Sequence, residues 1–96
     1  MRAERFDPEG NADPAELRVT GWAWYQLDSM LFLVGADAAD PARRPAFMGG
    51  TPPPFWRISD LARIVELGEE DPWRQRMARE LLAAVMADLA ADAGLR

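Results

Sequence analysis

A chain of 96 residues with 49% hydrophobic and 28% charged residues has the composition of one small globular domain, residues 1–96, and not of a disordered segment. Its net charge of -5 argues against direct binding to nucleic acid, which requires a basic surface. The absence of Cys, His and Lys excludes disulfides, thiolate and histidine metal sites, Ser-His or Cys-His catalysis and lysine Schiff bases.

Nothing in the sequence predicts export or membrane insertion. The first ten residues lack the apolar core of a signal peptide, and the longest apolar run, residues 30–36, is far shorter than the roughly 20 residues of a membrane span. We therefore expect a cytoplasmic protein that does not bind membranes. Its richness in Ala, Arg, Gly and Pro is typical of a GC-rich bacterial or phage source.

The first 25 residues predict mainly strand. Residues 1–6 are expected to form a short edge strand before a turn at 7–11, which contains Pro and Gly. Asp13 begins a helix-start pattern, but residues 17–25 are rich in Val, Thr, Trp and Tyr, which favour strand. A helix over residues 17–34 is the alternative.

The predicted strand over residues 17–25 has an irregular apolar pattern. Strict alternation would place Leu17 and Val19 on one face and both Trp22 and Trp24 on the other. One extra residue near Gly21 would bring all four onto a single apolar face, and a glycine inside a strand often marks such a bulge. We therefore predict a β-bulge near Gly21.

The middle of the chain predicts a turn, a buried strand and a long loop. Residues 26–29 are expected to turn, and the apolar run at 30–34 to form a strand buried on both faces. Residues 35–54 predict a loop with one helical turn near Pro41. At its end Pro52–Pro54 predict polyproline II, which we interpret as a stiff spacer because the run lacks PxxP spacing and leads directly to a helix.

Two helices are predicted at the C-terminal end. Ser59 is expected to cap the first and Gly68 to end it, while Asp71 caps the second, Pro72 opens it and Gly94 follows its last turn. The apolar stripes consist of Leu61, Ile64, Val65 and Leu67 in the first helix, and of Met77, Ala78, Leu81, Leu82, Val85, Met86 and Leu89 in the second.

These elements predict an α+β fold. A small antiparallel β-sheet of about three strands is followed by a Pro-rich loop and by two C-terminal helices packed on the sheet. An all-α fold is the alternative.

The chain offers little for catalysis. Its carboxylates are scattered through turns, caps and helix faces, where exposed carboxylates ordinarily lie. The hydroxyl groups have neither His nor Lys as a base, and so short a chain encloses a water-excluded cleft with difficulty. We therefore predict no catalytic residue, no metal, no cofactor and no enzymatic activity; a small carboxylate-dependent enzyme ranks third among the functions considered.

The large aromatic residues carry the clearest binding signal. Trp and Arg are enriched in the residues that dominate protein interfaces, and Arg57 follows two rings directly, where it could stack on one of them. The first-ranked function is a non-catalytic protein-binding module, such as a regulator, inhibitor or assembly factor. The predicted protein-binding residues are Phe55, Trp56, Arg57, Trp22 and Trp24.

The acidic residues allow a second function. A small acidic protein can imitate nucleic-acid phosphates and inhibit a nucleic-acid-binding protein, as phage anti-defence inhibitors do. The candidate acidic patch consists of Glu66, Glu69, Glu70 and Asp71.

The last predicted helix also has a row of small residues on its polar side. Ala83, Ala87 and Ala90 form a ridge that a second helix could approach closely. A homodimer through the C-terminal helix is therefore a further hypothesis.

Overall fold

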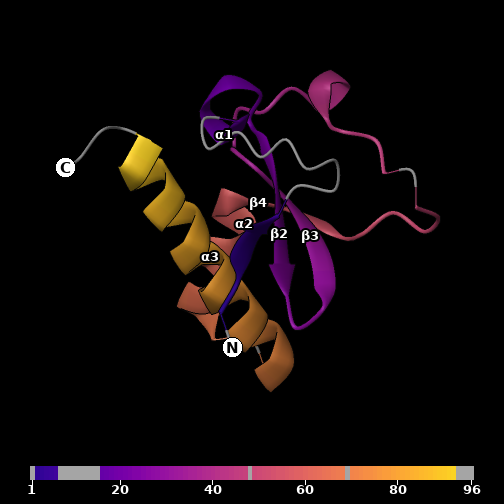
Figure 1. Cartoon of the computed structure of the whole chain (residues 1–96). Helices are drawn as coiled ribbons and strands as arrows, with labels where there is room; N and C mark the ends of the chain where they lie inside the picture. The colour runs from indigo at the N-terminus through magenta and orange to yellow at the C-terminus, as the bar shows by residue number, and fades with distance from the viewer. Residues whose placement is uncertain (1, 7–15, 48, 69, 93–96) are drawn as a thin grey trace.

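The computed structural model describes residues 2–6, 16–47, 49–68 and 70–92. It contains a four-stranded sheet in the order β1-β2-β3-β4 and two long helices that follow the sheet in the sequence, so the predicted α+β class is confirmed (Figure 1). The elements are β1 (Glu4–Phe6), α1 (Glu16–Val19), β2 (Trp22–Leu27), β3 (Met30–Gly35), a 3-10 helix (Pro41–Arg43), β4 (Phe55–Arg57), α2 (Ile58–Leu67) and α3 (Pro72–Asp92).

A tight hairpin joins β2 to β3. Leu27 pairs with Met30, and the two residues between them, Asp28 and Ser29, have φ angles of 53° and 67°. Positive φ at both central residues is the signature of a type I′ turn, whose twist matches that of the flanking strands. The predicted turn is confirmed at its last two residues, since residues 26 and 27 belong to β2. The strand predicted at 30–34 is present and is buried from Phe32 onward, but Met30 is 43% exposed.

The fourth strand makes the sheet mixed, whereas a purely antiparallel sheet was predicted. β4 lies parallel to β3, with Leu33 opposite Phe55. The Leu33 N–H donates to the Pro54 carbonyl oxygen at 3.1 Å. The next step of a parallel ladder would require Pro54 to donate to Leu31, and proline has no N–H. The proline run therefore limits β4 to three residues.

Residues 17–21 differ from the predicted bulged strand. Leu17 lies in α1, because the helix-start pattern overrides the local strand preference, and the Thr20 N–H and hydroxyl both donate to the Glu16 carbonyl oxygen. Gly21 has a φ of +86° and forms the bend between α1 and β2, not a bulge. Leu17 joins the core beneath the helices, whereas Val19 is 62% exposed; neither shares a face with the tryptophans.

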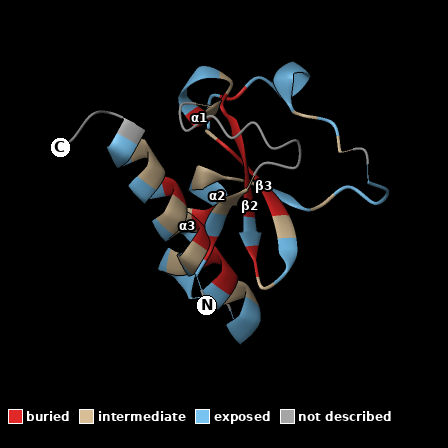
Figure 2. Ribbon diagram, in the orientation of Figure 1, coloured by how far each residue is buried: buried red, intermediate tan, exposed pale blue. Residues whose placement is uncertain are grey.

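The sheet has an inner face covered by helices and an outer face covered by a loop (Figures 1 and 2). α2 and α3 pack on the inner side chains of β2 and β3. On the outer face, Ala36, Ala39 and Phe47 pack against side chains of β2 and β3. Residues 36–47 and 49–54 have no regular structure apart from the 3-10 helix near Pro41, which was predicted. The inner core contains Ala3, Leu17, Ala23, Tyr25, Leu27, Phe32, Val34, Leu61, Ile64, Met77, Ala78, Leu81 and Val85.

The start of α2 is stabilised by a residue far away in the sequence. Ser59 was predicted to cap this helix, but it lies inside the first turn, and its backbone N–H donates to Asp37 Oδ1 at 2.9 Å. Asp60 accepts the Arg57 N–H at 3.2 Å, so two carboxylates satisfy the free amides of this end. Gly68 ends the helix in the left-handed conformation, as predicted.

The other predicted helix boundaries are confirmed in part. Asp71 accepts the Trp73 N–H at 3.0 Å and caps α3, with Pro72 as its first residue. Gly94 lies outside the described residues. Two members of the predicted stripes are exposed, Leu67 at 76% and Met86 at 53%, because the buried stripe of each helix is narrower than predicted.

Candidate functional site

Strand alternation separates the five predicted binding residues. Trp22 and Trp24 of β2 point to the outer face together with Phe55 of β4, whereas Trp56 points to the inner face. Arg57 returns to the outer face, where its guanidinium lies 5.0 Å from the Trp22 ring centroid. The sequence analysis named these five residues as one candidate set, and the structure divides them between the two faces of the sheet.

Trp56 belongs to the contact between the sheet and the helices. Its ring packs against the inner core, and the Arg74 guanidinium lies 4.6 Å from the ring centroid. Its indole N–H is buried without a hydrogen-bond partner among the described residues. Trp56 therefore contributes no ring surface to the outer face.

Arg57 fixes the loop that covers the outer face. Its Nη1 donates to the carbonyl oxygens of Ala36 and Ala39, at 2.9 and 3.0 Å. The predicted stacking on Phe55 or Trp56 is replaced by stacking on Trp22. Through these contacts Arg57 holds the start of the loop against the sheet.

Trp22 forms the base of the outer face. It is fully buried, and its Nε1 donates to the Asp40 carbonyl oxygen at 3.0 Å. The Trp22 and Phe55 rings form a T-shaped pair with their centroids 5.9 Å apart. A Cβ on Gly35, which is opposite in the β2–β3 register, would lie 2.6 Å from the Trp22 ring. Glycine at position 35 therefore makes room for the indole.

A groove of about 470 Å³ opens between the sheet and the covering loop. Trp24 is largely buried and lies at the base of the groove, with its ring centroid 5.9 Å from that of Phe47. Phe55 forms part of the wall and is 46% exposed. The lining residues are Trp24, Leu33, Pro41, Arg44, Pro45, Ala46, Phe47, Pro52, Pro53 and Phe55. Rings and prolines therefore dominate this surface, and among the described residues Arg44 is its one charged member.

Arg44 is a groove residue that the sequence analysis missed. Its guanidinium lies 4.8 Å from the Phe55 ring centroid, and its backbone N–H donates to the Pro41 carbonyl oxygen. Within the described ranges no carboxylate forms an ion pair with it. Phe47 was missed too, because residues 35–54 contain few large side chains; the sequence signal for both was the charged and aromatic content of residues 43–47.

A second hollow adjoins this groove. It has a volume of about 340 Å³ and is lined by Phe6, Gln26, Ser29, Leu31 and Phe47. Phe47 lines both spaces. The outer face therefore offers two adjoining concave surfaces along β3.

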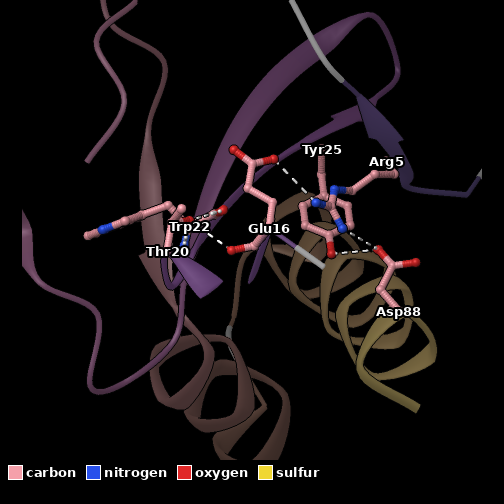
Figure 3. A network of polar contacts seen from close by, with 6 residues as sticks. All are labelled: Arg5, Glu16, Thr20, Trp22, Tyr25 and Asp88. Atoms are coloured by element: carbon pink, nitrogen blue, oxygen red, sulfur yellow. Dashed lines mark hydrogen bonds and ion pairs between the residues drawn. The ribbon is translucent and has the colours of Figure 1, made fainter. Parts of the chain in front are cut away.

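A polar network ties the inner face to α3 (Figure 3). Arg5 lies 3.3 Å from Glu16 and 3.6 Å from Asp88, and the Tyr25 hydroxyl donates to Asp88 at 2.7 Å. Burial, followed by the hydrogen bond to Asp88, raises the pKa of Tyr25 well above its usual range. Because Tyr25 is fully buried, no substrate reaches its hydroxyl. We interpret this network as a structural connection and not as a catalytic site.

The predicted acidic patch is only partly described. Glu66, Glu70 and Asp71 are exposed, and Glu69 lies outside the described residues. Asp71 already caps α3. In the described part of the chain, no three acidic residues gather closely enough to hold a metal ion.

The outward side of α3 carries the predicted alanine row. Ala83, Ala87 and Ala90 are all exposed, and Met86 lies beside them. The homodimer proposed through this row stays a prediction.

None of the helices in the described ranges combines the length and apolar character needed to cross a bilayer.

Comparisons of this chain with protein-family models, curated proteins and solved structures give no match.

Proposed function

We propose that this chain is a non-catalytic protein-binding module, a regulator, inhibitor or assembly factor, and that the groove on the outer face of the sheet is its binding surface. One observation carries the proposal. Among the described residues, an aromatic sheet face is covered by a loop and not by a helix, which leaves a concave surface lined by rings and prolines. Ligand sites are typically mainly apolar hollows with a few placed polar groups.

The composition of the groove supports binding over catalysis. None of the described residues that line it carries a carboxylate, a hydroxyl or a thiol, so this part of the lining contains no nucleophile and no general acid–base pair. Phe55 and Arg44 present a ring and a guanidinium side by side at the wall. Aromatic and Arg side chains are enriched in protein interfaces.

Partner capture with matched variants tests the proposal. The tagged chain is used as bait in a lysate of its source organism, and proteins captured by wild type, Phe55→Ala and Trp73→Ala are compared by quantitative mass spectrometry. Trp73 is the control, because its ring is 45% exposed at the start of α3, away from the groove. We expect a protein whose recovery falls about tenfold or more with Phe55→Ala and is unchanged with Trp73→Ala.

The acidic-decoy function predicts a different result. Its partner would be a nucleic-acid-binding protein that is retained by Phe55→Ala, released at about 0.5 M salt, and lost when Glu66 and Glu70 are both changed to Arg. That pattern would reject the groove as the binding surface. A partner lost only when Ala83 or Ala87 is enlarged would reject it as well.

A further inference from the structure

We infer that the groove takes an extended peptide segment of a partner protein in which an acidic residue stands next to a large apolar residue. This inference rests on the proposed function and adds the chemistry of the partner. Three features carry it: the charge of Arg44, which no described carboxylate neutralises, the edge of β3 at Leu31, with which β4 does not pair, and the ring-lined hollows beside that edge.

The positive charge of Arg44 favours a ligand that carries a carboxylate. Arg44 is exposed and its guanidinium lies over the Phe55 ring, so no described side chain accepts from the N–H groups at its edge, which face solvent and can bind a ligand. A guanidinium presents its donors in a plane that matches a carboxylate, and the two form a bidentate pair. No acidic side chain among the described lining residues competes for this position.

The edge of β3 at Leu31 favours a ligand with an extended backbone, which could pair with it. The Leu33 N–H points away from β2, because it donates to Pro54. Leu31 lies two residues earlier, so its N–H and carbonyl point to the same side. β4 pairs only with Leu33–Gly35, and the missing N–H of Pro54 prevents further pairing. A peptide strand can therefore pair with Leu31 where β4 stops.

The open edge and the hollows occupy the same part of the molecule. If the register of Leu33 with Phe55 continued, Pro53 would stand opposite Leu31, and Pro53 lines the groove. Leu31 itself lines the second hollow with Phe6 and Phe47. Alternate side chains of an added strand point to one face, so they would enter these hollows while the backbone pairs with the edge.

The other occupants fit these features less well. The groove contains a single cation and the chain has a net charge of -5, which opposes a nucleic-acid strand. A second copy of the chain would have to offer a free, extended acidic segment. Among the described exposed carboxylates, Glu4 is already paired with β2, Asp37 and Asp40 accept the Ser59 and Ala42 N–H groups, and Glu66 and Asp71 lie in or at the end of a helix. A partner's peptide segment satisfies the charge, the edge and the rings together.

Selection from a random peptide library tests the inference. A display library of peptides about ten residues long is selected on the full chain and, in parallel, on Arg44→Gln and Arg76→Gln, the latter an exposed arginine of α3. We expect wild type and Arg76→Gln to enrich peptides with Asp or Glu beside Phe, Trp, Leu or Ile. The consensus peptide should bind Arg44→Gln about tenfold more weakly, and replacing its acidic residue by the amide should cause the same loss without further loss in Arg44→Gln.

Amide hydrogen exchange tests the backbone pairing. Saturating consensus peptide should slow exchange of the Leu31 amide about tenfold or more, while the exposed amide of Gly50 should not change. Peptides that lose binding with Phe55→Ala, lack acidic residues and bind Arg44→Gln equally would overturn the inference and leave the proposed function standing. Enriched peptides that bind Phe55→Ala as well as wild type would overturn both. An unprotected Leu31 amide in the saturated complex would overturn strand pairing.

Discussion

The Tyr25 hydroxyl donates a 2.7 Å hydrogen bond to Asp88, and this contact joins the middle of β2 to a residue 63 positions later in α3. Arg5 of β1 approaches the same carboxylate oxygen at 3.6 Å, and its guanidinium lies 5.8 Å from the Tyr25 ring centroid. The inner face of the sheet is therefore tied to the last helix by polar contacts as well as by apolar packing.

Tyr25→Phe should lower the free energy of unfolding by about 1–2 kcal/mol, because it removes a hydrogen bond to a charged group from a buried position. Asp88→Asn is the control. Its amide oxygen still accepts the hydroxyl, so it should lose only the half-exposed ion pair, worth about 0–1 kcal/mol. Urea denaturation measures both, and a Tyr25→Phe variant as stable as wild type would contradict the role assigned to this contact.

Stability should fall in alkaline solution. Burial and the contact with Asp88 raise the pKa of Tyr25 in the folded state above the value of about 10 that tyrosine has when unfolded. The stabilisation is therefore fully present below about pH 10 and is lost as the pH rises above it. Urea midpoints measured from pH 8 to 11 should decline for wild type and decline less for Tyr25→Phe.

Asp37→Asn should lower the thermal midpoint by a few degrees, because a neutral amide is a weaker acceptor at the start of α2. The Ser59 backbone N–H, followed by its side chain, holds the pKa of Asp37 below its ordinary value. Its stabilisation is thus present above about pH 4 and is lost as the pH falls through the lower folded pKa. Melting curves at pH 7 and pH 3 should differ less for Asp37→Asn than for wild type.

Gly21→Ala should be strongly destabilising. At a φ of +86°, an added Cβ would lie 2.7 Å from the Ala39 Cβ and 3.0 Å from its Cα, so both the backbone and the contact resist the change. Gly68→Ala is the control, since Gly68 has a φ of +70° and open space around it. We expect a loss of about 1 kcal/mol for Gly68→Ala and at least twice that for Gly21→Ala in chemical denaturation.

Arg57→Lys should destabilise the chain although the charge is kept. One Arg57 nitrogen donates to two loop carbonyls while the guanidinium plane lies over Trp22, and an ammonium cannot reproduce both contacts. The expected loss is about 1–3 kcal/mol. The exposed Arg63→Lys should stay within about 0.5 kcal/mol of wild type in the same urea titration. Equal stability of the two variants would contradict the structural role of Arg57.

The features predicted correctly from the sequence depend on neighbouring residues. Gly68 ends α2 and Asp71 caps α3 because end signals act over one helical turn. The hairpin turn and the helical turn near Pro41 are equally local. The fold class follows from the order of these elements, and it was predicted without any long-range contact.

The features missed from the sequence depend on distant residues. The parallel pairing of β4 and the contact between Asp37 and Ser59 both join segments that the loop brings together. The bulge predicted at Gly21 placed Leu17 and Val19 with the tryptophans, because one inserted residue reverses the face of every side chain beyond it in a strand, whereas both residues lie in α1. The groove could not be predicted either, since its walls depend on where residues 41–47 and 52–53 lie relative to the sheet.

Strand β4 passes into α2 without a connecting residue, since Arg57 ends the strand and Ile58 begins the helix. Phe55 and Trp56 lie one peptide bond apart on opposite faces of the sheet, one at the groove wall and the other beneath Arg74. A ligand that displaces Phe55 should therefore alter the surroundings of an indole on the far side of the sheet. Trp56 is thus placed to act as an intrinsic fluorescent reporter of events in a groove that it does not line.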